Sequence, residues 1–224
     1  MQALAHRSDS PFLQANWQAE ALSWTEQAHL VAWSPSVARR IAFATEMGQF
    51  IQAQEQMEVL PLYGRCIDGV EAFCQELERC IPGSPLARRV DGPRGIVNLL
   101  RSRDATHRGL PARHRYFIWH DADVLLRRDP RLFGALLDAM MGVAAEAEYV
   151  SDDLLLLSRV ILVGGPRLAD YAAGGASQLQ GWLPGVHGEP FWRLVTGLER
   201  PPVRVAPIDE IAAGPRLGAM DLVR

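Results

Sequence analysis

The sequence predicts a three-layer α/β protein with a mostly parallel sheet and helices on both faces. Runs that favour helices of ten or more residues alternate with short apolar runs suited to buried strands. Those apolar runs fall at residues 59–63, 116–120, 159–163 and 203–206. This alternation is typical of a parallel sheet, because each parallel strand needs a long crossover before it.

Composition narrows the chemistry that the chain can perform. The 224 residues are 48% hydrophobic and 22% charged, with a net charge of -3, which is ordinary for a globular protein of one domain and an extension. All 23 basic residues are arginines. A lysine Schiff base, a lysine general base and the phosphate-gripping lysine of a standard P-loop are therefore excluded.

The first 56 residues are expected to form a tail and a helical extension. Residues 19–56 favour helix, with an interruption at Ser34-Pro35. Ser34 can cap the second helix, with Pro35 at its first position. Apolar residues follow at helical spacing, namely Val37, Ile41, Phe43, Ala44, Met47, Phe50 and Ile51. We expect this region to dock on the body, or to meet a protein partner or a second copy of the chain.

The core domain is expected to span residues 57–206, followed by an irregular tail at 207–224. A long helix is predicted from 130 to 148. In parallel sheets, ligands bind beyond the carboxyl ends of the strands. We therefore looked for chemistry in the loops that follow residues 63, 120 and 163.

The loop after residue 63 has the GxxxxG spacing of a phosphate loop. Val70 and Glu71 stand where such a loop has Lys and then Ser or Thr. An ordinary turn explains the spacing equally well, but backbone amides at a helix N-terminus can hold a phosphate without lysine. The candidate nucleotide-binding residues of this loop are Gly64, Arg65, Asp68 and Gly69.

An acidic pair follows the apolar run at 116–120. Asp121 and Asp123 are separated by one residue. Two such carboxylates can share a divalent cation, because hard cations prefer oxygen ligands. The alternative is that one of them caps the following turn and both face solvent. Asp121 and Asp123 are our candidate metal ligands.

Residues 57–170 resemble the core of a P-loop NTPase of the AAA+ kind. The resemblance places Gly64 and Gly69 in the phosphate loop and Asp121 at the acidic strand end. Arg159, which opens the later apolar run, is a further candidate nucleotide-binding residue from its position, where a sensor would stand. The missing lysine, the missing Ser or Thr and the Asp-Ala-Asp sequence depart from active members. The resemblance implies ATP or another nucleotide with Mg²⁺, bound without hydrolysis, in a nucleotide-responsive or structural interaction protein.

A second resemblance competes with the first. Asp121-Ala122-Asp123 is similar to the Asp-x-Asp segment of nucleotide-sugar glycosyltransferases, in which both aspartates bind the metal that bridges the sugar diphosphate. It implies a metal-dependent transferase. A third interpretation is a protein-interaction module without a ligand. The sequence leaves open whether the protein is an enzyme.

Eight arginines between Arg88 and Arg115, against two aspartates, form a basic patch. Such a patch can contact nucleic-acid phosphates. No Phe, Trp or Tyr is interleaved for base stacking, which favours a solvated loop instead.

The sequence also bears on location. No apolar run of about eighteen residues predicts a membrane span, and the first residues do not resemble a signal peptide. We expect no membrane contact and a cytoplasmic protein.

Overall fold

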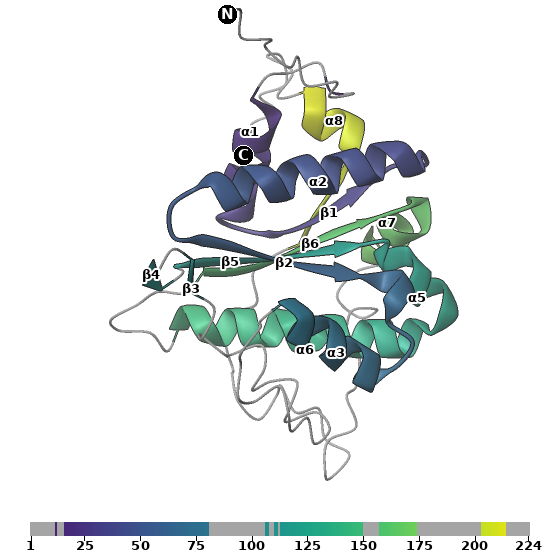
Figure 1. The fold of residues 1–224 in the computed structure, drawn as a ribbon. Helices are drawn as coiled ribbons and strands as arrows, with labels where there is room; N and C mark the ends of the chain where they lie inside the picture. The colour runs from purple at the N-terminus through teal and green to yellow at the C-terminus, as the bar shows by residue number, and fades with distance from the viewer. Residues whose placement is uncertain are drawn as a thin grey trace, which may run out of the picture.

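Among the described residues, five parallel strands form one sheet in the order β2-β5-β6-β1-β7. The computed structural model describes Phe12 and residues 16–80, 106–107, 110–111, 113–149, 157–173 and 203–213. Helices lie on both faces of the sheet (Figure 1). The three-layer α/β fold that the sequence predicts is confirmed.

In chain order, the described elements form two halves, with a small antiparallel pair between them. The first half contains α1 (Trp17–Thr25), β1 (His29–Trp33), α2 (Val37–Ala53), β2 (Met57–Tyr63), the 3-10 turn η1 (Gly64–Cys66) and α3 (Val70–Cys80). The second half contains β5 (His114–His120), α5 (Ala122–Arg128), α6 (Pro130–Tyr149), β6 (Leu157–Gly164), α7 (Pro166–Ala173), β7 (Val203–Pro207) and α8 (Ile208–Ala213). Between them, β3 (Thr106–His107) and β4 (Leu110–Pro111) form a separate antiparallel pair. None of these helices is both long and apolar enough to cross a bilayer.

Four strands lie where the sequence predicts them, but β1 does not. Residues 29–33 fall in the segment that we expected to be helical, and that expectation was wrong. β1 pairs with β6 on one side and with β7 on the other. A five-residue apolar run is too short to show a period, so its neighbours in the sheet determine its conformation. The N-terminal segment thus contributes an inner strand as well as helices.

Two hydrophobic layers lie on opposite faces of the sheet. Helices α1, α2 and α8 cover one face, and α3, α5, α6 and α7 cover the other (Figure 1). Alternate residues of β5 enter the two layers, with Tyr116 and Ile118 in the first and Phe117 and Trp119 in the second. Burial on both faces explains why this strand is a continuous apolar run.

The N-terminal tryptophan belongs to the core. Trp17 is 1% exposed and stacks on Phe43 of α2, with ring centroids 4.9 Å apart. Because α1 and α2 meet through these rings, α1 is held against the same face of the sheet as α2.

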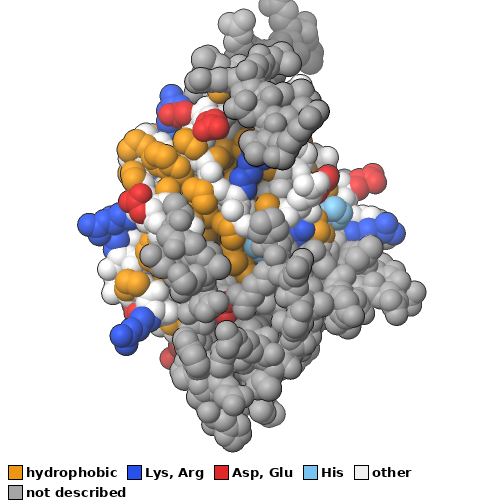
Figure 2. Space-filling view, turned by 180° about the vertical axis from the view of Figure 1, so that it is seen from behind, with side chains coloured by type: hydrophobic (Ala, Val, Ile, Leu, Met, Phe, Trp, Pro, Cys, Tyr) orange, Lys and Arg blue, Asp and Glu red, His pale blue; other side chains and the backbone are white. Residues whose placement is uncertain are grey.

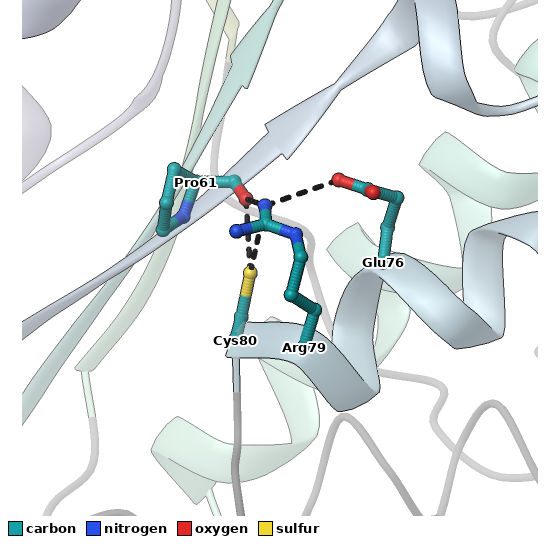
Figure 3. Close-up of polar contacts among 4 residues, drawn as sticks. All are labelled: Pro61, Glu76, Arg79 and Cys80. Carbon is teal, nitrogen blue, oxygen red and sulfur yellow. Dashed lines mark hydrogen bonds and ion pairs between the residues drawn. The ribbon is translucent and has the colours of Figure 1, made fainter.

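The outer strand β2 is protected at Pro61, which lies within it. The Pro61 carbonyl accepts hydrogen bonds from Arg79 Nη2 at 3.0 Å and from Cys80 Sγ at 2.9 Å, and Arg79 also pairs with Glu76 at 3.1 Å (Figure 3). Proline has no N–H to donate. At this point the strand therefore offers neither a donor nor an unused acceptor to another strand.

The two cysteines of α3 are predicted to react slowly. Burial raises the pKa of the Cys74 thiol and that of the Cys80 thiol to about 11. Because the thiolate is the nucleophile, only about 0.1% of each group is reactive at pH 8. Iodoacetamide labelling read by mass spectrometry should modify the exposed Cys66 first. Equal rates at Cys66 and Cys80 in the folded protein, with all three reacting alike in urea, would show that the end of α3 is open.

Candidate functional site

The chain leaves two neighbouring strands toward opposite faces of the sheet. β1 continues into α2 on one face, and β6 continues into α7 on the other. Because β1 and β6 are paired, this is the topological switch point, where ligands bind in open parallel sheets. We define the switch point by five residues near the carboxyl ends of these strands: Ser34, Arg40, Asp123, Gly164 and Gly165.

A turn of three residues, 34–36, joins β1 to α2. Ser34 N donates to the Gly164 carbonyl at 3.1 Å, which ties the turn to the end of β6. The Ser34 hydroxyl oxygen accepts from Ser36 N at 3.2 Å. Ser36, and not Ser34 as we expected, caps α2, because its hydroxyl oxygen accepts from Arg39 N at 3.4 Å. The helix therefore begins at Val37, with its N-terminus beside the switch point.

Two arginines occupy the beginning of α2, where the helix dipole disfavours positive charge. Each is paired with an aspartate. Arg39 meets Asp209 of α8 at the surface. Arg40 Nη1 lies 3.2 Å from Asp123 Oδ1, and these two side chains are 13% and 7% exposed. The second pair joins α2 on one face of the sheet to α5 on the other, past the ends of β1 and β6.

The glycine pair at the end of β6 makes room for the Asp123 carboxylate. A Cβ at Gly164 would lie 3.1 Å from Asp123 Oδ1 and 2.8 Å from Leu168 Cδ2. A Cβ at Gly165 would lie 3.2 Å from Asp123 Oδ2 and 3.4 Å from Arg40 Nη1. Without side chains here, the backbone can approach both charged groups closely.

One donor of Arg40 is unused. Its Nε is buried and has no hydrogen-bond partner among the described residues. A buried donor without an acceptor is unfavourable by about 1–3 kcal/mol. The guanidinium can therefore donate a hydrogen bond to a further anionic oxygen, and arginine is well suited to phosphate groups.

The loop predicted to bind phosphate lies elsewhere. It follows β2, and β5 and β6 separate that strand from β1. The loop packs on the protein, because Ile67 is fully buried and its carbonyl accepts from Arg128 Nη1 at 3.2 Å. Arg65 lies 5.7 Å above the Tyr63 ring, and Asp68 is exposed. The structure does not bring these predicted residues to the switch point.

The two glycines of that loop differ in their surroundings. A Cβ at Gly64 would lie 2.2 Å from the Asp121 carbonyl oxygen, whereas a Cβ at Gly69 would meet nothing within 4 Å. Gly64 is needed because β2 and the corner after β5 approach each other closely. The contact at Gly64 explains that glycine without a phosphate.

The predicted acidic pair is divided between two environments. Asp121 has φ 50° and makes no side-chain capping bond, while Asp123 is buried against Arg40. Arg127 Nη2 also lies 3.8 Å from Asp123 Oδ2. No cluster of three or more His, Cys, Asp and Glu side chains within the described ranges could hold a metal ion. That Asp121 and Asp123 share a cation stays a prediction.

Arg159 lies at the opposite end of the sheet from the switch point. It donates to the carbonyls of Thr25 and Glu26, both at 2.7 Å, near the start of β1. Gly164 lies five positions further along β6, which is about 16 Å along a strand. Its predicted role beside the phosphate loop has no support in this placement.

The predicted basic patch falls mostly outside the described residues. Of its arginines, only Arg113 and Arg115 are described. Arg115 is buried and paired with Glu58 on β2, so it is a core ion pair and not part of a solvated loop.

Sequence reasoning missed Ser34, Arg40, Gly164 and Gly165 as site residues. One signal was available, because Arg39-Arg40 directly follows a helix start, where acidic residues are favoured. The strand order was not available from the sequence, and it is the strand order that places residues 34–36 beside residues 164–165.

No protein-family model and no curated protein matches this chain. A solved structure does match, described as the structure of the Aeropyrum pernix ORC2 protein in ADPNP and ADP complexes. The TM-score is 0.51 and the identity 12%, over 78% of this chain and 47% of that chain. Our chain thus spans about half the length of the ORC2 chain. At this identity the likeness shows the fold alone, a parallel sheet with helices on both faces.

The shielded ion pair should contribute measurably to stability. Arg40→Gln leaves the buried Asp123 carboxylate with only Arg127, 3.8 Å away, so it should lower the free energy of unfolding in urea by about 2 kcal/mol. The matched variant Arg39→Gln breaks the exposed pair with Asp209 and should cost less than about 1 kcal/mol. Equal losses from the two variants would contradict the difference in shielding.

The glycines of the 64–69 loop should respond differently to substitution. Gly64→Ala should lower the free energy of unfolding by about 3 kcal/mol, because the methyl group meets the Asp121 carbonyl. Gly69→Ala should change the free energy of unfolding by less than about 1 kcal/mol, because its methyl group meets nothing within 4 Å and the residue only precedes the start of α3. Urea titrations of both variants test this difference, and a well-tolerated Gly64→Ala would refute the close approach.

Proposed function

We propose that the protein is a non-hydrolysing, nucleotide-responsive interaction protein, and that nucleotide phosphates bind at its switch point. The observation that carries this proposal is Arg40, whose side chain is mostly shielded near the start of α2 and whose buried Nε has no partner among the described residues. The fold likeness to a protein described in ADPNP and ADP complexes gives independent support.

The switch point has the chemistry that a phosphate needs. The N-terminus of α2, a helix of 17 residues, carries a partial positive charge, which favours a bound anion. Arg40 adds a full positive charge with several donors. Gly164 and Gly165 allow close approach of an anion to the backbone. The residues present therefore fit a phosphate group without any lysine.

The same residues argue against hydrolysis. P-loop enzymes use a lysine on the outer phosphates, a hydroxyl on Mg²⁺ and acidic or amide groups that hold metal or water. The chain has no lysine, and the 34–36 turn has no glycine. The Asp123 carboxylate is held between Arg40 and Arg127, so its charge is already balanced. Binding without turnover is the expected outcome.

An interaction role is supported by the outer side of α2. Val37 and Ile41 are each 55% exposed and lie one helical turn apart, beside Arg40 in the sequence. Seen from behind the view of Figure 1, the molecule has hydrophobic side chains gathered on one side as well, among arginine and acidic side chains (Figure 2). Exposed apolar groups of this kind are typical of protein contacts. We propose that a protein partner, or a second copy of the chain, contacts the beginning of α2.

A thermal-shift screen tests the ligand class. ATP, ADP, GTP and a UDP-sugar would each be added with and without Mg²⁺ or Mn²⁺. We expect ADP and ATP to stabilise the fold by about 2.7 kcal/mol at one hundred times the dissociation constant. Phosphate release from ATP should stay at the rate without protein.

Other outcomes of the screen would replace the proposal. Stabilisation only by the UDP-sugar with Mn²⁺ would favour the transferase, with Asp121 and Asp123 as metal ligands. No stabilisation by any compound would favour an interaction module without a ligand.

A further inference from the structure

We infer that the Arg40–Asp123 ion pair is a latch that phosphate opens by taking Arg40 from Asp123. The inference rests on the proposed function, and it adds how binding at the switch point is sensed. In the closed state the carboxylate of Asp123 is paired with the guanidinium of Arg40, which a phosphate would also bind. In the open state Arg40 contacts the phosphate, and Asp123 pairs with Arg127.

The existing bond uses only part of the guanidinium. Arg40 contacts Asp123 through Nη1 alone, at 3.2 Å, while its buried Nε has no partner among the described residues. Arginine binds most strongly when two parallel donors meet two oxygens. A phosphate group carries enough oxygens to engage both donors. It is therefore a better acceptor for Arg40 than the carboxylate in its present position.

Asp123 has a second partner in reach. Arg127 lies four residues further along α5, with its Nη2 3.8 Å from Asp123 Oδ2 and half of its side chain exposed. An acid followed by a base at this spacing forms a favourable pair on a helix. When Arg40 leaves, Asp123 keeps a positive neighbour, so the buried carboxylate is not stranded. Because Asp123 can exchange Arg40 for Arg127, a phosphate can displace it from Arg40.

Opening of the latch would change the contacts of α5. Asp123 lies in the first turn of this helix, and Arg128 at its end holds the Ile67 carbonyl at 3.2 Å. The closed latch ties α5 to the beginning of α2, near the exposed Val37 and Ile41. An open latch removes that tie, so phosphate binding would change the surface that we propose for a partner.

Calorimetric titration without Mg²⁺ tests the competition. Asp123→Asn removes the competing charge with little change in shape, so its affinity for ADP should rise about tenfold. Arg40→Gln should lower the affinity by a similar factor. The double variant should bind as weakly as Arg40→Gln alone, because Asp123 acts only through Arg40. Arg39→Gln, whose partner is the surface residue Asp209, is the matched control and should bind as the wild type does.

A comparison of ADP, pyrophosphate and adenosine distinguishes binding through the phosphate groups from binding through the nucleoside. Asp123→Asn should raise the affinity for ADP and for pyrophosphate by the same factor and leave the affinity for adenosine unchanged. An effect confined to adenosine would overturn the latch. A wild type that binds ADP while Asp123→Asn binds it equally or more weakly would overturn the latch and leave the proposed function standing. Failure of the wild type and of all variants to bind ADP would overturn both.

Hydrogen exchange on the wild type tests the latch without a variant. ADP should speed amide exchange in residues 122–128, because α5 loses its tie to α2. Unchanged or slower exchange there in the ADP-bound protein would contradict the opening, even if Asp123→Asn proved unstable.

Discussion

The charge of Arg40 has to be balanced inside the fold. Its guanidinium is almost fully shielded and lies near the start of α2, where the helix dipole also opposes a cation. Asp123 provides the balancing charge from the opposite face of the sheet. That carboxylate fits only because Gly164 and Gly165 carry no side chains. A three-residue turn, a glycine pair and the start of α5 are thus all constrained by one ion pair.

The same arrangement connects fold and function. The loops that follow β1 and β6 lead to opposite faces of the parallel sheet, and ligands of such sheets bind at this switch point. Here the carboxylate of Asp123 meets the guanidinium of Arg40 at that position, in a fold that resembles that of the ORC2 protein. A carboxylate and a phosphate compete for the same guanidinium by the same electrostatics. The proposed function and the proposed latch are therefore two consequences of one charge.

Much of the fold could be predicted from the sequence, but the switch point could not. Strands 59–63, 116–120, 159–163 and 203–206 were found because each is an apolar run between helical segments. β1 was missed because its apolar run stands between two segments that favour helix and directly before a helix cap. The GxxxxG spacing drew attention to Gly64, whose real constraint is the Asp121 carbonyl. Spacing along the chain carries no information on strand order, so it could not place Arg40 beside Asp123.

The most direct test of the central claim follows the arginine side chains by NMR while ADP is added without Mg²⁺. The Nε–Hε signal of Arg40, assigned by its loss in Arg40→Gln, should move on binding because this group gains an acceptor. The signal of Arg65, beside the 64–69 loop, should stay in place. Movement at Arg65 with no change at Arg40 would place the phosphate at that loop and contradict the account.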